Sequence, residues 1–211
     1  MADKRASNSL TGRTKVTVFT DRDGVLNLKA GYLHRVEDFE FFPGAPQAVK
    51  RLNDVGALVL VVTNQAGVAR GYYTEADVDA LHEHIQRELG RFGARIDRFY
   101  YCPHHPEGVV PQYTRTCDCR KPRPGMFLRA IDDLDLAGDL RFAVGDRYPD
   151  LIAGAAVGCR TVLVRTGYGQ ERPADETGII IKPDYVTSSF GEAVDWILRA
   201  ASNLATEKPG G

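Results

Sequence analysis

Residues 57–62, Ala-Leu-Val-Leu-Val-Val, form a continuous apolar run that ends in Thr63, Asn64 and Gln65. A short run rich in β-branched residues, without polar alternation, is typical of a strand that is buried on both faces. Such strands occur almost entirely in parallel sheets that helices cover on both sides. The run therefore constrains the chain to an α/β fold built on a central parallel sheet.

Strand and helix patterns alternate along the rest of the chain. Strands are predicted at residues 16–20, 57–62, 96–101, 140–144 and 161–165. Helices are predicted at residues 45–55, 125–134, 149–157 and 190–201, with a further helix after the N-cap residue Thr74. This alternation predicts right-handed crossovers within one sheet. A chain of 211 residues supports one core, so we expect a single domain over residues 16–201 between disordered tails at 1–15 and 202–211.

Composition and charge argue against several classes of protein. A net charge of −1 gives no general attraction to nucleic acid, and no apolar run approaches the roughly 18 residues that span a membrane. The first fifteen residues are polar and lack the apolar segment of a secretory signal. Together with the clustered cysteines described below, these features predict a cytoplasmic protein, and we expect a monomer with a small-molecule substrate.

Two carboxylates, Asp21 and Asp23, follow the first predicted strand directly. Ligands of parallel sheets bind beyond the carboxyl ends of the strands, where Asp146 also falls. Magnesium prefers carboxylate and other oxygen ligands, so Asp21, Asp23 and Asp146 are predicted to hold it. The ion would let Asp21 attack phosphorus, while Asp23 would protonate the leaving oxygen and later deprotonate water. The alternative is a solvated Asp-x-Asp-Gly turn.

A calcium-binding EF-hand does not fit these acids. The fifth, sixth and twelfth positions of its loop would be Val25, Leu26 and Tyr32, which are not an oxygen ligand, glycine and glutamate.

Phosphate-binding groups are predicted at two further places. The hydroxyl of Thr63 and the polar groups of Asn64 and Gln65, at the end of the second strand, could hold phosphoryl oxygens. Lys121 could neutralise phosphate charge. The alternatives are a helix cap for the first group and a solvated surface cation for the lysine. Asp150, four residues after Asp146, is predicted to orient ligands rather than bind metal.

Three cysteines and a histidine have the spacing of a zinc site. Cys102-x-His104 is followed after twelve residues by Cys117-x-Cys119, and three thiolates with an imidazole suit tetrahedral zinc. Disulfide pairing would leave one of the three cysteines over. Four protein ligands close the site, so the predicted zinc is structural and pins the loop at residues 102–119. His105 is the alternative to His104 as ligand.

With these residues assembled, the chain resembles the haloacid dehalogenase (HAD) superfamily of phosphatases, over residues 16–169. The motifs that carry the resemblance are Asp21-Arg22-Asp23-Gly24, Thr63-Asn64-Gln65, Lys121, Gly145-Asp146 and Asp150. Cys-Pro-His-His-Pro-Glu-Gly and Cys-Asp-Cys-Arg-Lys-Pro narrow it to the branch of histidinol-phosphate and heptose-bisphosphate phosphatases, and look closest to the heptose enzymes.

The resemblance implies a three-layer Rossmann-like HAD fold and a role for each motif. It implies that Asp21 is the nucleophile, that Asp23 is the acid/base, and that the Asp23 backbone carbonyl joins Asp21 and Asp146 on magnesium. Arg147 stands where lysine is frequent in the family. No insertion exceeds about 25 residues, so no large cap domain is expected and the zinc loop would serve as a reduced lid.

The resemblance also implies a sugar bisphosphate substrate, whose second phosphate needs cations. Arginine forks match phosphate geometry. The expected substrate-binding residues are Lys29, Tyr32, Asn64, Gln65, Arg120 and Lys121, with Arg70 and Arg123 as further candidates. The alternative for each exposed cation is a solvated surface group.

Three functions are compatible with these patterns. The first is a magnesium-dependent phosphatase that removes the 7-phosphate of D-glycero-D-manno-heptose 1,7-bisphosphate in nucleotide-activated heptose biosynthesis. The second is a histidinol-phosphate phosphatase. The third is a non-catalytic sugar-phosphate-binding protein on the same scaffold, and the acid/base candidate Asp23 argues against it because a binding protein has no need of one.

Overall fold

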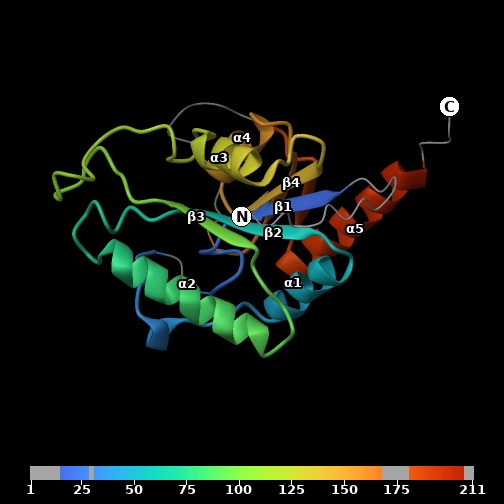
Figure 1. Cartoon of the computed structure of the whole chain (residues 1–211), viewed down its shortest axis with the longest axis horizontal. Coiled ribbons are helices and arrows are strands. Elements are labelled where there is room, and N and C mark those ends of the chain that lie inside the picture. Colours follow the sequence, from blue (N-terminus) through green and yellow to red (C-terminus); the bar gives the residue numbers. More distant parts are fainter. Residues whose placement is uncertain (1–14, 29–30, 168–180, 207–211) are drawn as a thin grey trace, which may run out of the picture.

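The structure is a computed structural model that describes residues 15–28, 31–167 and 181–206 (Figure 1). Its strands are β1 (Val16–Thr20), β2 (Leu58–Asn64), β3 (Arg98–Cys102), β4 (Leu140–Gly145), β5 (Arg160–Val164) and β6 (Tyr185–Thr187). Its helices are α1 (Ala45–Asp54), α2 (Glu75–Gly90), α3 (Gly125–Leu134), α4 (Tyr148–Ala155) and α5 (Phe190–Thr206), with a short 3-10 turn η1 (Val36–Asp38).

The strands form one parallel sheet in the order β3-β2-β1-β4-β5-β6. The chain order therefore runs outward in one direction from β1 to β3 and in the other from β4 to β6. The reversal lies between β1 and β4, where Thr20 pairs with Val144. Crevices at such a reversal, outside the carboxyl ends of the strands, are where open α/β sheets bind ligands. Asp21 follows β1 and Asp146 follows β4 at this point.

Helices cover both faces of the sheet and produce three layers, as Figure 1 shows. Successive residues of a strand point to opposite faces, so Val18 enters one core and Phe19 enters the other. The first core contains Val49 of α1, Leu81 of α2 and Val194 of α5. The second contains Phe127 of α3 and Ala153 of α4. The predicted α/β fold with a central parallel sheet is confirmed.

Strand β2 extends further than the apolar run predicted. It spans Leu58–Asn64, so Thr63 and Asn64 lie within the strand although they are polar. Both side chains have hydrogen-bond partners, Gln65 for Thr63 and the Lys121 backbone for Asn64. Partnered polar groups can be buried at little cost, which explains why the strand continues past its apolar part.

Two predictions near the C-terminus are corrected. Strand β6 was not predicted, because three residues carry no clear periodicity. Helix α5 extends to Thr206 instead of ending at Ala201, so residues 202–206 are helical. This stretch contains no glycine or proline, and its Leu204 and Ala205 favour helix. Among the described helices, none has the length and apolar character needed to cross a bilayer.

Thr74 is the N-cap residue of helix α2, as predicted. The Thr74 hydroxyl accepts a hydrogen bond from the Asp77 backbone N–H at 3.2 Å, and the Asp77 carboxylate accepts from the Thr74 N–H at 2.7 Å. This reciprocal capping box satisfies two N–H groups that a helix start leaves unpaired. The helix start carries Glu75, which contacts the cysteine-rich loop described below.

Candidate active site

Asp21 lies at the reversal of strand order, directly after β1. Its backbone N–H donates to the Val144 carbonyl at 2.9 Å, which continues the pairing of β1 with β4 by one residue. The carboxylate oxygen Oδ1 accepts hydrogen bonds from the Arg22 N–H at 2.8 Å and from the Lys121 ammonium at 3.1 Å. The side chain is therefore oriented by a neighbouring backbone group and a cation, and it remains 12% exposed.

Lys121 reaches this site from the segment between β3 and α3. Its ammonium donates to the Val62 carbonyl and to Asp150 Oδ1, each at 2.6 Å. The amide of Asn64 holds the lysine backbone through two bonds, to its carbonyl at 3.0 Å and from its N–H at 3.1 Å. Burial alone would lower the pKa of Lys121, but Asp150 and Asp21 raise it above the ordinary value. The lysine is thus a buried, fully charged cation.

Three carboxylates converge beside this lysine. One oxygen from each of Asp21, Asp146 and Asp150 lies within 4.8 Å of the others. Burial raises the pKa of Asp150 to about 6, although Lys121 acts in the opposite direction. Three acids facing one lysine make an excess of negative charge, and an oxygen donor set of this kind suits Mg²⁺. The Asp23 carboxylate is not part of this group.

Two glycines pack directly against the Asp146 carboxylate. A Cβ at Gly24 or at Gly167 would overlap Asp146 Oδ2, and Gly24 also has a φ of +82°. Only glycine adopts that backbone conformation without strain. The backbone therefore approaches the carboxylate more closely than any side chain would permit, which brings the Asp21–Gly24 turn over the end of β4.

Asp23 is held by a different set of partners. Its carboxylate accepts from Arg22 Nη2 at 2.8 Å, from Gln65 Nε2 at 3.0 Å and from Asn27 Nδ2 at 3.1 Å. Gln65 also donates from Nε2 to the Thr63 hydroxyl at 2.9 Å. The amide of Gln65 thus connects the acid/base candidate with the hydroxyl predicted to bind phosphate.

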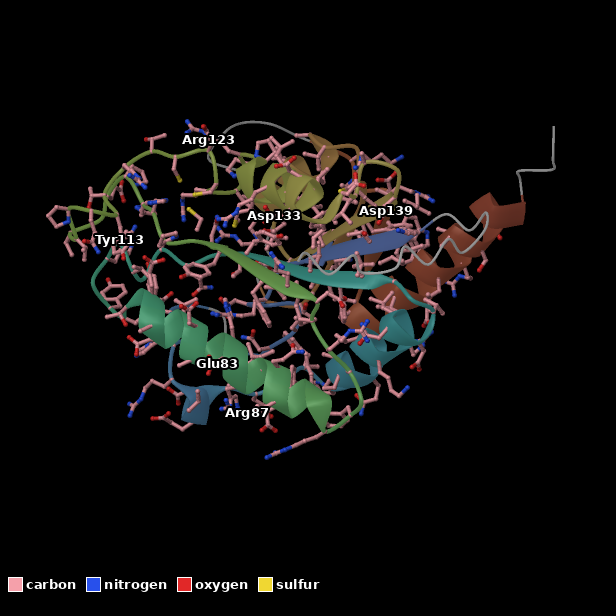
Figure 2. All side chains as sticks on the ribbon, viewed as in Figure 1. Glu83, Arg87, Tyr113, Arg123, Asp133 and Asp139 are labelled. Carbon is pink, nitrogen blue, oxygen red and sulfur yellow. The ribbon has the colours of Figure 1, made fainter. Side chains whose placement is uncertain are left out.

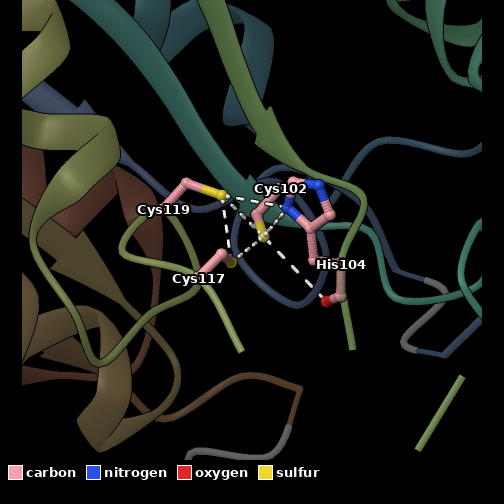
Figure 3. A group of neighbouring side chains, drawn as sticks. All are labelled: Cys102, His104, Cys117 and Cys119. Atoms are coloured by element: carbon pink, nitrogen blue, oxygen red, sulfur yellow. Dashed lines mark hydrogen bonds between the residues drawn. The ribbon is translucent and has the colours of Figure 1, made fainter. Parts of the chain in front are cut away.

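Cys102, His104, Cys117 and Cys119 converge as Figure 3 shows. The Sγ atom of Cys119 lies 3.1 Å from that of Cys102 and 3.2 Å from that of Cys117, and His104 Nδ1 lies 3.3 Å from Cys119 Sγ. Hydrogen bonding from Cys102, against the effect of burial, lowers the pKa of Cys119 to about 5. Three sulfurs and one imidazole nitrogen gathered in this way form a group that could hold a metal ion.

His104, and not His105, joins the thiols. The His105 ring instead accepts from the Glu107 N–H at 3.1 Å and lies 3.4 Å from Arg70. The four cysteines of the chain, all at described positions, are free thiols. The disulfide alternative is therefore not realised.

The loop at residues 102–119 has attachments beyond its cysteines. The backbone N–H groups of Val109 and Val110 both donate to the Ala69 carbonyl, at 2.7 and 3.0 Å. The Tyr113 hydroxyl donates to Glu75 Oε1 at 2.5 Å. Figure 2 shows Tyr113 out on this loop, at the end of the molecule where β3 ends. The loop is thus fastened to the segment between β2 and α2.

Comparisons with known proteins agree with this geometry. A family profile described as HAD-hydrolase-like matches residues 118–193, and one described as polynucleotide kinase 3 phosphatase matches residues 11–153. The D-glycero-beta-D-manno-heptose-1,7-bisphosphate 7-phosphatase of Haemophilus ducreyi is 42% identical over 185 residues, which cover 87% of this chain and 98% of that protein. Its counterpart from Escherichia coli K12 is 40% identical over 188 residues, which cover 89% and 90%.

A solved structure gives the same result. The D,D-heptose 1,7-bisphosphate phosphatase from B. bronchiseptica, complexed with magnesium and phosphate, superposes with a TM-score of 0.74 at 33% identity, over 88% of this chain and 99% of that chain. This chain belongs to the heptose-bisphosphate phosphatase family of HAD-like hydrolases. It is a phosphoric monoester hydrolase, and the non-enzymatic hypothesis is set aside.

Among the expected substrate-binding residues of this phosphatase, one lies beside the cysteine-rich loop and one lies at the surface. The Arg120 guanidinium donates to the His104 carbonyl at 3.5 Å, beside the thiol cluster. The Tyr32 ring is 45% exposed and contacts Tyr72 edge-on, with ring centroids 4.5 Å apart. Lys29 lies outside the described residues.

The two further arginine candidates contact the loop itself. Arg70 Nη2 lies 3.4 Å from Glu107, and Arg123 Nη1 donates to the Cys117 carbonyl at 2.9 Å. Figure 2 shows Arg123 at the outer surface above the loop. Both are partly exposed, and both contact the loop at residues 102–119.

Two residues of this phosphatase make contacts that sequence patterns do not reveal. Arg22, between the two acids, is fully buried, whereas a charged residue beside a turn is ordinarily solvated. Asp150 contacts Lys121 directly, and its other oxygen accepts from the Arg147 backbone N–H at 3.1 Å. Arg147 contributes this backbone group, and the residue itself is exposed.

Proposed function

We propose that this phosphatase hydrolyses the 7-phosphate of D-glycero-D-manno-heptose 1,7-bisphosphate through a phosphoenzyme formed on Asp21. The observation that carries the proposal is the position of Asp21. It lies at the reversal of strand order, bonded to the Lys121 ammonium and grouped with the carboxylates of Asp146 and Asp150. The substrate follows from the relatives, which are named for this heptose and are about 40% identical over most of the chain.

The chain supplies a nucleophile and a proton donor on neighbouring residues. The Asp21 carboxylate forms a bond to phosphorus as the bond from phosphorus to the sugar oxygen breaks. Asp23 gives its proton to that oxygen and then takes one from the water that cleaves the aspartyl phosphate. Lys121 and the Thr63 hydroxyl hold phosphoryl oxygens, and the amide of Asn64 keeps the lysine backbone in place.

Magnesium would be held by Asp21, Asp146 and the backbone carbonyl of Asp23. When bound, it offsets the repulsion between the Asp21 carboxylate and the phosphate. Asp150 bonds both Lys121 and the start of α4, so its role is to orient the lysine. Zinc would occupy the Cys102, His104, Cys117 and Cys119 site, where four protein ligands leave no open position for catalysis.

The sugar and its second phosphate would bind beneath the cysteine-rich loop. Arg120 is the nearest arginine to the Cys-His site in sequence and is held against the His104 carbonyl. With Lys29, Tyr32, Asn64 and Gln65 it completes the proposed substrate-binding set. We further propose that the enzyme is a cytoplasmic monomer, with no nucleic-acid or membrane partner.

A two-substrate assay tests the proposed substrate. Purified protein with magnesium is given heptose 1,7-bisphosphate and, separately, histidinol phosphate. We expect turnover of the heptose substrate to exceed that of histidinol phosphate by kcat/KM, with heptose 1-phosphate as the product seen by phosphorus NMR. Preference for histidinol phosphate would overturn the proposal in favour of the second function, and release of the 1-phosphate would refute the assignment of the 7-phosphate as the group removed.

The nucleophile is tested by Asp21→Asn. We expect this variant to lose turnover and to keep its zinc, because the metal-binding cysteines are on another segment. Asp54→Asn, which changes an exposed carboxylate at the end of α1, is the matched control and should leave turnover unchanged. Full activity of Asp21→Asn would exclude the aspartyl-phosphate mechanism.

A further inference from the structure

Arg22 is fully buried. Among the described residues, it is the largest side chain with essentially no exposure to solvent. A guanidinium stays protonated at any ordinary pH. Removing such a charge from water costs several kcal/mol unless partners compensate it. The burial of Arg22 therefore requires partners that compensate the charge of its guanidinium.

The principal partner of Arg22 is the acid/base residue. Nη2 donates to Asp23 Oδ2 at 2.8 Å and to Oδ1 at 3.1 Å, and Nε donates to Oδ1 at 3.2 Å. The guanidinium also donates to the Leu33 carbonyl at 3.3 Å, to His82 Nε2 at 3.3 Å and to Gln65 Oε1 at 3.2 Å. An arginine only donates, so Nε2 must be the accepting nitrogen of a neutral His82.

Gln65 fixes the same carboxylate from the other side. Its Nε2 donates to Asp23 Oδ2 at 3.0 Å and to the Thr63 hydroxyl at 2.9 Å. Its Oε1 accepts from Arg22 Nη2 at 3.2 Å and from the Tyr73 hydroxyl at 2.8 Å. All of the hydrogen-bonding capacity that an amide has is thus used within the protein, and the side chain is 1% exposed.

Fold stability alone does not account for this arrangement. A buried ion pair can often be replaced by apolar residues of similar volume without loss of stability. Here Arg22 and Gln65 both donate to one carboxylate, that of Asp23, which keeps 15% of its side chain exposed. The partners thus leave the carboxylate accessible while they fix its rotation.

We propose that Arg22 and Gln65 are positioning residues, which orient the Asp23 carboxylate so that its proton reaches the departing oxygen of the substrate. The inference rests on the proposed function, in which Asp23 is the acid/base. The P–O bond to the leaving group breaks as the Asp21–phosphorus bond forms, and the leaving oxygen takes the proton from Asp23. A displacement of about 1 Å in such a group costs up to ~100-fold in rate.

Leaving-group dependence separates positioning from a general loss of structure. Phenyl phosphate releases a basic oxygen that needs a proton, whereas p-nitrophenyl phosphate releases a stable anion. The measured quantity is kcat/KM, which reports the steps up to the first phosphoryl transfer and excludes hydrolysis of the phosphoenzyme. The ratio of kcat/KM for the two esters also cancels the fraction of active protein.

The variants are Gln65→Met, which keeps the length of the side chain and removes both donors, and Arg22→Lys, which keeps the charge and removes the fork. We expect Gln65→Met to lower kcat/KM about 100-fold for phenyl phosphate and less than about 10-fold for p-nitrophenyl phosphate. Arg22→Lys should also lower kcat/KM more for phenyl phosphate than for p-nitrophenyl phosphate, with a smaller difference between the two esters. If one variant does not fold, the two esters are compared with the other variant alone.

A double-mutant cycle with Asp23→Asn completes the test. If Gln65 acts through Asp23, Gln65→Met should have little further effect on phenyl phosphate once Asp23 is replaced. Equal losses on both esters, or a full loss from Gln65→Met in the Asp23→Asn background, would overturn the proposal. Because both esters are general phosphatase probes, this result is independent of whether the natural substrate is the heptose bisphosphate.

Discussion

The clearest pH dependence expected of this protein comes from His82. Its ring is 5% exposed, stacks on Phe99 with centroids 4.4 Å apart, and accepts from Arg22. Burial, and secondarily the charge of Arg22, lower the pKa of His82 from 6.5 to about 3. Between pH 3 and pH 6.5, His82 therefore stays neutral in the folded state, whereas it is protonated in the unfolded chain.

The sign and the size of the effect follow from this difference. Between pH 6.5 and pH 3 the unfolded state binds more protons, so the free energy of unfolding falls as the pH is lowered through this window. Each pKa unit corresponds to about 1.4 kcal/mol, which gives a loss of about 2 kcal/mol between pH 7 and pH 5 from this residue. At pH 7 and above, His82 is neutral in both states and contributes no pH dependence.

The matched variant is His82→Gln, which offers Arg22 an amide oxygen and does not titrate. Losing the stack on Phe99 lowers its stability at every pH by the same amount. Urea denaturation of both proteins at pH 7, 6 and 5 should therefore show the wild type losing about 2 kcal/mol more than the variant over this range. Other titrating groups, including the thiol cluster, are common to both and cancel. Parallel pH profiles would refute a buried neutral His82.

Two further predictions concern the metal sites. Cys117→Ser removes one of three sulfurs that lie within 3.5 Å of each other. We therefore expect elemental analysis to show loss of bound zinc, and the Tm to be lower by about 5–10 °C. A full equivalent of zinc in the variant would contradict the ligand set. Gly24→Ala places a Cβ against Asp146 Oδ2 at a φ of +82°, so we expect half-maximal activation to need at least about 10-fold more magnesium while zinc content is unchanged. An unaltered magnesium titration would show that the turn is not packed against the metal ligand.

The sheet, and most of the polar groups at the carboxyl ends of its strands, could be predicted because each depends on a local sequence pattern. Apolar β-branched runs identify the buried strands, and parallel strands bring their carboxyl ends to one edge. This reasoning brought Asp21 and Asp146 together, and the spacing of the cysteines identified the thiol cluster. Strand β6 and the end of α5 were missed because neither depends on a pattern longer than a few residues.

The contacts of individual polar side chains could not be predicted in the same way. In sequence, Arg22 is one more charged residue in a polar turn, and its burial depends on Leu33, Gln65 and His82, which come from three other segments. Likewise, nothing local indicates that Glu75 accepts from both Tyr101, at 2.8 Å, and Tyr113. Such partners are set by the tertiary arrangement, and they decide which polar residues are functional.

The difference between Asp21 and Asp23 illustrates this point. In an extended chain, residues two apart point the same way and would share one environment. The chain leaves the strand at Thr20, however, and the two carboxylates acquire different cations. Lys121, Asp146 and Asp150 lie beside Asp21, whereas Arg22 and Gln65 enclose Asp23. In the mechanism that we propose, one carboxylate attacks phosphorus and the other, held apart from the acidic group, transfers the proton, so that two identical side chains take different roles in one reaction.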